Sequence, residues 1–344
     1  MSKLPALQRL GFFTRVLDQA DPAERYRMGL AQIIHAERCG YDSAWVAQHH
    51  FHENEGGLPA PLIFLAQAAA RTSRIRLGTG IITLPLEMPI RVAEDTSVLD
   101  HMSGGRLEVG VGPGGNMTAF RAFGLDSENR GSLMDAHLAL LRTAWAGQPL
   151  VGGDVLYPAN PGLDTRVWQA SFGVFGAKRA GAAGDGLLLS RTQPRPAEAP
   201  DMTLAEMQNP MLDAYIAALP VGVAPRILAS RSVYVADDRE GALRFAEIGL
   251  RRARARLAEA GHPAAAGPIE GVIAAFDIHI GTPSEVLDSL LADSTLQRAT
   301  DLAVQVHSVD PPHPFILRSI ELMAEKVAPA LGWTGGPPDM RRVA

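Results

Sequence analysis

The sequence predicts an α/β fold, a single (β/α)8 TIM barrel spanning residues 1–344, and three observations support this prediction. Short apolar runs alternate with longer segments of helical spacing, so successive strands run parallel and each returns through a helix. There are eight strand candidates, and this number favours a closed barrel over a doubly wound open sheet with the same local pattern. The length allows a barrel of roughly 250 residues plus insertions.

The strands are predicted from continuous apolar runs, as expected for parallel strands that are buried on both faces. They cover residues 9–14, 43–48, 75–84, 107–112, 167–174, 186–190, 227–235 and 302–307. Asp21 and Pro22 open the first helix as an N-cap and a first-turn proline, and Gly40 ends it. Helices are predicted over 21–39, 60–72, 89–102, 131–146, 177–183, 241–260, 283–292 and 315–331.

Two stretches rich in glycine or proline do not fit the repeat and are predicted to be insertions. Residues 148–166 follow the fourth strand, and residues 192–225 follow the sixth. Loops that follow barrel strands lie on the catalytic face, so 192–225 is expected to form a lid or a pocket wall.

Composition argues against several classes of protein. The net charge of -5 argues against nucleic-acid and anionic-membrane binding, which require a basic surface. The longest run without charged side chains, 56–70, is broken by Pro59 and Pro61, so no membrane span is expected. The single Cys39 and the absence of a signal-peptide pattern lead us to expect a reducing, cytoplasmic location.

Three histidines follow the second strand: His49, His50 and His52. A histidine whose pKa lies near neutrality is a natural general base, so His49 and His50 are the catalytic candidates. Alternatively, His50 and His52 form a zinc-binding pair, but only His307 and Asp310 lie at another strand end that could complete it. No metal site is therefore predicted, and each histidine could equally be a loop residue that is hydrogen-bonded to backbone.

Two glycine-rich turns follow later strands. Residues 110–115 match G-x-G-x-x-G, but Pro113 removes a backbone N–H, so Gly112 and Gly114 are expected to let a flat group approach rather than bind a dinucleotide. The second turn opens a helix, where free N–H groups and the helix dipole favour an anion, with Lys178 and Arg179 beside it. Its residues are Gly173, Val174, Phe175, Gly176 and Ala177. The alternative is a plain turn with two solvated cations.

Arg191 directly follows the sixth strand, with Arg195 nearby. Both are assigned to the substrate pocket or its lid, because a cation on the catalytic face could receive an anionic group. Pairing with an acidic residue of the following loop is equally compatible with the sequence.

Collinear segments over most of the chain resemble the bacterial luciferase-like family of flavin-dependent monooxygenases. They cover residues 45–51, 71–85, 89–95, 99–107, 119–124, 183–186, 281–285 and 325–331. Residues 10–14 and 190–196 are similar to an uncharacterised FMN-dependent subgroup.

The resemblance implies that FMN binds at the carboxyl ends of the strands. His49 corresponds to the catalytic histidine of the family, and a cis peptide beside the flavin would join Gly80 and Ile81. The flavin phosphate would lie at residues 173–177, and Gly112, Gly114 and Ser190 would also contact the cofactor.

Three positions depart from the luciferase pattern. Gln48 replaces a Glu, Pro113 replaces an Arg that helps to hold the phosphate, and Gly112 replaces a reactive Cys. The phosphate cation is therefore expected to be Lys178 or Arg179. These changes argue against an aldehyde reaction of the luciferase type more than against flavin binding.

The activity implied by the resemblance is oxygenation of a small organic substrate by O2 and reduced FMN through a flavin C4a-peroxide, with His49 as the base and water excluded. A separate NAD(P)H-flavin reductase would supply the reduced flavin, and helices 60–72 and 89–102 would form a homodimer interface. Two other activities remain open: hydride transfer with a deazaflavin on the same barrel, and zinc-dependent hydrolysis through His50 and His52. A flavin-binding or storage protein without activity is a more distant alternative.

Overall fold

A double pairing of the last barrel strand closes the sheet into a ring. A computed structural model describes residues 7–196 and 198–335. In it, β10 (Asp301–Gln305) pairs in parallel with β1 (Arg9–Thr14) on one side and with β8 (Ile227–Val235) on the other. The remaining barrel strands are β2 (Ser43–Val46), β3 (Arg76–Thr79), β5 (Leu107–Gly112), β6 (Val167–Ser171) and β7 (Gly186–Leu189). The predicted (β/α)8 barrel is confirmed.

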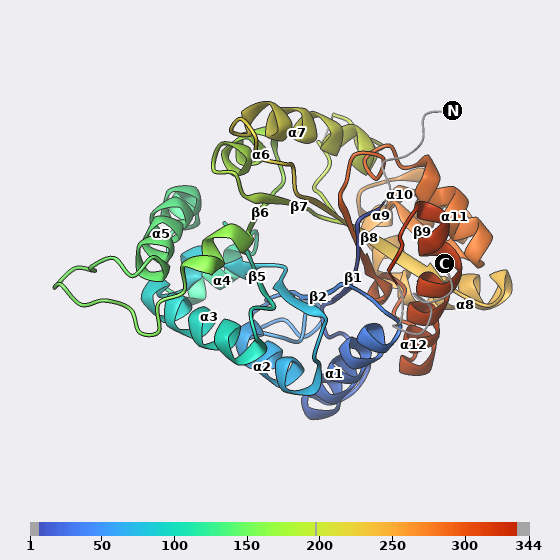
Figure 1. Ribbon diagram of the computed structural model, residues 1–344. Helices are drawn as coiled ribbons and strands as arrows, with labels where there is room; N and C mark the ends of the chain where they lie inside the picture. Colours follow the sequence, from blue (N-terminus) through green and yellow to red (C-terminus); the bar gives the residue numbers. More distant parts are fainter. Residues whose placement is uncertain (1–6, 197, 336–344) are drawn as a thin grey trace.

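Helices surround the ring of strands (Figure 1). The principal ones are α1 (Pro22–Arg38), α2 (Pro61–Arg71), α3 (Pro89–Ser103), α5 (Arg130–Trp145), α6 (Val174–Ala182), α7 (Leu204–Ala218) and α12 (His313–Leu322). Shorter elements include β4 (Ile82–Thr83), which pairs with β5, and α4 (Met117–Ala122). No helix in residues 7–196 and 198–335 is long and apolar enough to cross a membrane.

The residues that the chain has beyond a minimal barrel lie partly outside the two predicted insertions. The stretch 192–225 was expected to be a loop insertion, but it contains α7, the regular crossover helix between β7 and β8, which begins with a capping box of Thr203 and Glu206. Pro210 lies inside this helix and obscured its pattern in the sequence. The glycine-rich stretch after β5 does include the long loop that projects at the left of Figure 1.

The connection between β8 and β10 is the longest in the barrel. It holds α8 (Arg239–Gly249), α9 (Arg251–Glu259), α10 (Ile269–Ala275), the strand β9 (Ile278–Gly281) and α11 (Pro283–Ala292). The sequence did not predict β9, which pairs with the second half of β8. It also predicted one helix over 241–260, where the structure has two that meet at Leu250. The predicted strand 167–174 ends at Ser171, because Gly173 is already the N-cap of α6.

Two tryptophans fill the centre of the barrel. The rings of Trp45 and Trp168 meet edge to face, with centroids 5.7 Å apart and planes at 86°. Gly78 and Gly186 make room for them: a Cβ at either position would lie 2.2 Å from an indole carbon. The barrel is therefore a packed core without a pore, and its open end lies above this layer.

A buried ionic network lies below the tryptophans, near the amino ends of the strands. Glu108 accepts a hydrogen bond from Trp168 Nε1 at 2.7 Å, and it pairs with Arg9 and with Arg76. Arg9 also lies 2.5 Å from Asp301. The carboxylates of Glu108 and Asp301 are thus buried but paired, as buried charges must be.

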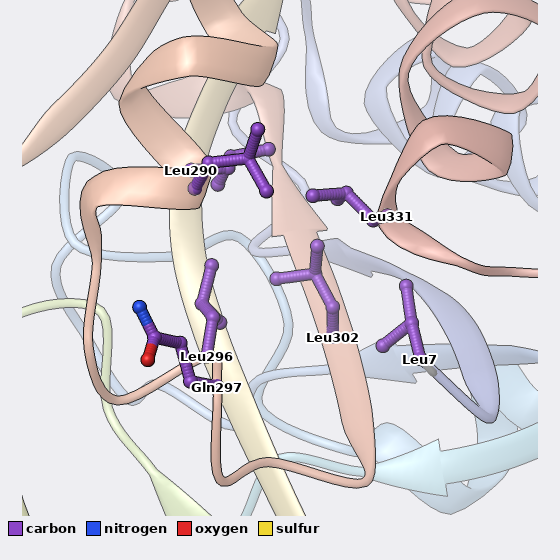
Figure 2. A pocket seen from close by; sticks show the side chains of 7 residues that line it. Leu7, Leu290, Leu296, Gln297, Leu302 and Leu331 are labelled. Atoms are coloured by element: carbon purple, nitrogen blue, oxygen red, sulfur yellow. The ribbon is translucent and has the colours of Figure 1, made fainter. Parts of the chain in front are cut away.

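A small apolar cavity lies at the same end of the molecule. Figure 2 shows that leucines surround it. They come from the segment before β1 (Leu7), from α11 and the turn after it (Leu290 and Leu296), from β10 (Leu302) and from a short helix near the end of the described chain (Leu331). It offers no charged side chain, and it lies opposite the carboxyl ends of the strands. The candidate site must therefore be sought at the other end of the barrel.

We expect Gly186→Ala to lower the free energy of unfolding by about 3 kcal/mol, because its Cβ would overlap the ring of Trp168 in a core that cannot expand. Denaturant unfolding measures this. The matched control is Gly131→Ala in α5, where a Cβ meets open space and should stabilise the helix by about 0.5 kcal/mol. Equal stability of the two variants would contradict the packing argument.

Candidate active site

Charged and titratable side chains gather at the carboxyl ends of the barrel strands. Arg15 directly follows β1, and His49 follows β2. The backbone N–H of His49 donates to the carbonyl of Leu58 at 3.0 Å, and a Cβ at Gly56 would lie 2.5 Å from the imidazole. The loop after β2 therefore folds back over the ring of His49 and fixes its place.

The imidazole of His49 is neutral at physiological pH. Burial is the largest cause, and the positive charges of Arg15 and Arg191 add to it, so that the pKa of His49 falls to about 3. A neutral imidazole can accept a proton or a hydrogen bond, which keeps His49 a candidate base. The same pKa shows that this part of the barrel mouth disfavours any additional positive charge.

His50 and His52 make separate contacts. The ring of His50 packs edge to face on Phe123, with centroids 5.0 Å apart, and its buried Nε2 has no hydrogen-bond partner among the described residues. His52 Nε2 lies 3.2 Å from the hydroxyl of Thr118. Within residues 7–196 and 198–335, no group of three or more His, Cys, Asp or Glu side chains could hold a metal ion. Within these residues, His50 and His52 therefore do not share a metal-binding group.

Gln48 forms hydrogen bonds with three other parts of the chain. Its Oε1 accepts the backbone N–H of Thr83 at 2.7 Å, and its Nε2 donates to the carbonyl of Pro59 at 3.1 Å and to Glu87 Oε1 at 2.6 Å. A glutamate at position 48 could not donate to Glu87. The presence of Gln48 instead of Glu is thus explained by its acidic neighbour.

An apolar platform lies above the two tryptophans. Phe13, Ile81 and Ala170 pack on the tryptophan layer and stay partly exposed at the open end. The Gly80–Ile81 peptide bond is cis, as the resemblance led us to expect. A Cβ at Gly112 would lie 2.6 Å from Ile81 Cδ1, so this glycine keeps the platform level and accessible to a flat ring.

The amino end of α6 is open for an anion. Gly173 is its N-cap and no side chain caps it, so the first N–H groups of the helix lack intrahelical acceptors. Val174 and Phe175 are exposed there, and Lys178 is exposed one turn further on. Arg179, the other cation predicted for this site, points elsewhere: it donates to Gln169 Oε1 at 2.9 Å and pairs with Asp135 at 3.1 Å.

The remaining predicted residues after β7 have different surroundings. The hydroxyl of Ser190 accepts the N–H of Thr192 at 3.2 Å and so shapes the loop. Arg191 donates to Gln305 Oε1 at 2.8 Å and to the hydroxyl of Ser232 at 3.2 Å. Arg195 forms an ion pair with Asp277, so its charge anchors the loop and is already neutralised.

Arg15, at the mouth, was not among the predicted site residues. It follows a strand end as directly as Arg191 does, and this signal could have identified it. His307, which the sequence suggested only as a possible zinc ligand, is buried, and its ring nitrogens lie 3.3 Å from Asp18 and 3.4 Å from Asp310. Burial opposes its positive charge, but these two carboxylates outweigh burial and raise the pKa of His307.

The comparisons with known proteins point to one family. The family described as luciferase-like monooxygenase matches residues 10–300. The 4-hydroxyprotoasukamycin monooxygenase of Streptomyces nodosus subsp. asukaensis is 32% identical over 219 residues, which cover 60% of this chain and 58% of that protein. The alkanal monooxygenase alpha chain of the Kryptophanaron alfredi symbiont is 38% identical over 120 residues, 35% of this chain and 32% of that one. The chain thus spans less than two thirds of these curated relatives.

Solved structures share the whole barrel. Monooxygenase RslO1 from Streptomyces bottropensis has a TM-score of 0.74 at 26% identity and covers 94% of this chain and 99% of its own. The oxygenating constituent of 3,6-diketocamphane monooxygenase from Pseudomonas putida, in complex with FMN, has a TM-score of 0.75 at 18% identity, over 94% and 98% of the two chains. The coenzyme F420-dependent tetrahydromethanopterin reductase from Methanopyrus kandleri has a TM-score of 0.67 at 18% identity, over 95% and 100%.

We expect Gln48→Glu to lower the free energy of unfolding by about 2 kcal/mol at pH 7, because two carboxylates would then share one half-buried site. The crowding raises the pKa of the new carboxyl, so the loss should shrink as the pH falls and the carboxyl is protonated. Denaturant unfolding at pH 5 and pH 7 tests this. The double variant Gln48→Glu with Glu87→Gln should recover most of the loss, and its failure to do so would remove the explanation.

Proposed function

Because this chain belongs to the luciferase-like monooxygenase family of flavin-dependent oxidoreductases, we propose that it uses reduced FMN and O2 to oxygenate a small organic substrate. One arrangement supports the proposal above all: an anion position at α6, an apolar platform and a neutral histidine occupy the same end of the barrel. These residues fit a phosphate, a flat ring and a reacting group in that order. A bound flavin would supply the activation of O2, which no side chain provides.

The chain's own residues would hold and orient the cofactor. The N–H groups of Val174, Phe175 and Gly176 would receive the phosphate, with the ammonium of Lys178 nearby. Phe13 and Ile81 would support the ring from below. The feature that favours a phosphate here is the combination of free N–H groups at the start of α6, its place at the carboxyl end of β6 and the exposed Lys178 one turn further on.

The loop after β7 would exclude water from the site. Gln193 from this loop donates to the carbonyl of Phe172 at 2.9 Å, which ties it to the turn before α6. Arg195 anchors the same loop through Asp277. The lid is thus proposed to be the short segment between β7 and α7, while α7 itself belongs to the barrel wall.

His49 would act as the base that accepts a proton from the substrate or during the oxygenation reaction. Burial and two arginines oppose its positive charge, so its imidazole is neutral and its lone pair is free, but without an anionic ligand it is a weak base. An anionic group in the site would raise its pKa toward the ordinary value and make it a stronger base.

Two partners complete the proposal. A separate NAD(P)H-flavin reductase would deliver reduced FMN. A second copy of the chain would cover the outer faces of α2 and α3, where apolar side chains are exposed: Ile63, Val98 and Met102.

We expect FMN to bind with micromolar or tighter affinity and Lys178→Ala to weaken FMN about tenfold while riboflavin, which lacks the phosphate, is unaffected. Quenching of flavin fluorescence measures both. Lys326→Ala is the matched control, because this exposed lysine lies on the C-terminal segment. Equal weakening of FMN and riboflavin would place the phosphate elsewhere. Binding of the deazaflavin F420 without binding of FMN would favour hydride transfer instead.

We expect His49→Ala to reduce product formation at least a hundredfold while the affinity for FMN changes less than threefold, because the imidazole acts on a proton and does not hold the cofactor. Mass spectrometry of small organic acids, ketones and alkenes, incubated with enzyme, FMN, NADH and a flavin reductase, measures the product. Unchanged turnover in the variant would remove His49 from the mechanism.

A further inference from the structure

Two arginines at the open end of the barrel lack a carboxylate partner. Arg191 donates to Gln305 and to Ser232, both of which are neutral. The Nε of Arg15 is buried and has no hydrogen-bond partner among the described residues. Neither guanidinium forms an ion pair with a carboxylate of residues 7–196 or 198–335, as the ion pairs found there show. Their charges are therefore compensated only at a distance.

Other arginines in the interior are satisfied. Arg231 lies 2.5 Å from Asp293, and Arg166 lies 2.6 Å from Asp100. Arg106, which has no ion pair, donates to the backbone carbonyls of residues 69, 72, 75 and 103. Among the described residues, Arg191 has neither a carboxylate nor such a set of carbonyls, since it donates only to Gln305 and Ser232, and Arg15 Nε has no partner. Burying a guanidinium with so few partners costs free energy, which a bound anionic ligand would offset.

Two acids attract these arginines without forming an ion pair with them. Asp310 acts on both Arg15 and Arg191, but its carboxylate lies 3.4 Å from the imidazole of His307. Glu55 acts on Arg15, but it accepts a hydrogen bond from Asn116 Nδ2 at 3.1 Å. Arg256 adds a further positive charge near Arg15. Burial and the repulsion between the two arginines lower the pKa of Arg191 to about 9, which shows how poorly its charge is compensated.

This positive region differs from the phosphate position at α6. Arg191 leaves the end of β7 and bonds to Ser232 on β8 and Gln305 on β10, away from β6 and the helix that follows it. Arg15 lies at the end of β1, on the other side of β10. The barrel mouth thus has two separate positions for negative charge, and FMN has only one phosphate.

Resting on the proposed function, we propose that the substrate is an organic carboxylic acid whose carboxylate lies between Arg15 and Arg191. A guanidinium presents two parallel N–H donors, which match the two oxygens of a carboxylate. A carboxylate held there would place the carbon skeleton beside His49, since both arginines act on that imidazole.

The experiment compares matched acids and amides on the FMN-loaded full-length protein. Benzoate and octanoate are titrated by calorimetry against benzamide and octanamide, which keep the skeleton but lose the charge. We expect at least one acid to bind ten times or more tightly than its amide. Arg15→Gln and Arg191→Gln should abolish this preference, and Arg191→Lys should retain part of it, because it keeps the charge and loses the fork.

The controls separate this proposal from the proposed function. Arg38→Gln, at an exposed arginine at the end of α1, should keep the preference for acids. Flavin fluorescence and circular dichroism, measured on each variant, should show FMN affinity within twofold and a folded barrel. If FMN fails to bind while the acids still bind the protein without it, the proposed cofactor is wrong and the carboxylate site stands.

Three results would overturn the carboxylate site. In the first, neither acid binds more tightly than its amide. In the second, Arg191→Gln weakens FMN as much as it weakens the acid, which would assign the arginine to the cofactor. In the third, inorganic phosphate binds as tightly as either acid, which would make this an inorganic-anion site.

Discussion

The edge-to-face contact of Trp45 and Trp168 is the constraint on which the site depends. These rings fill the axis of the barrel, and they fit only because Gly78 and Gly186 lack side chains. Below them, the indole N–H of Trp168 is held by the buried Glu108 network. Above them, the remaining space is bounded by a partly exposed apolar surface. Ligand chemistry is thereby confined to the end of the barrel where the carboxyl ends of the strands meet.

Two histidines at this end show how neighbouring charges decide the charge of an imidazole. His49 is surrounded by cations and is neutral, whereas His307 lies between Asp18 and Asp310 and favours its charged form. Burial acts to lower the pKa of both rings, so the difference in their pKa comes from the neighbouring charges. The barrel mouth therefore carries positive charge near Arg15, whereas the charge of His307 is balanced by Asp18 and Asp310.

The sequence was sufficient for the strands, because parallel strands buried on both faces are apolar throughout. It failed where a local signal was misleading: Pro210 obscured α7, and His279 interrupts the apolar run of β9. At the site, Lys178 and Arg179 could not be distinguished by sequence, because adjacent helical residues point about 100° apart and only one faces its partners on β6 and α5. Arg15 directly follows β1, so its place at the mouth could have been predicted, but that its Nε lacks a partner among the described residues is visible only in the folded chain.

The double pairing of β10 has a consequence for the biogenesis of the protein. Until β10 leaves the ribosome, β1 has a free edge and β8 lacks one of its neighbours. The barrel cannot close during most of translation, and the exposed edge of β1 is available to other extended chains in that interval. The last fifth of the chain thus protects the first strand, and truncations there should yield aggregates rather than a smaller folded barrel.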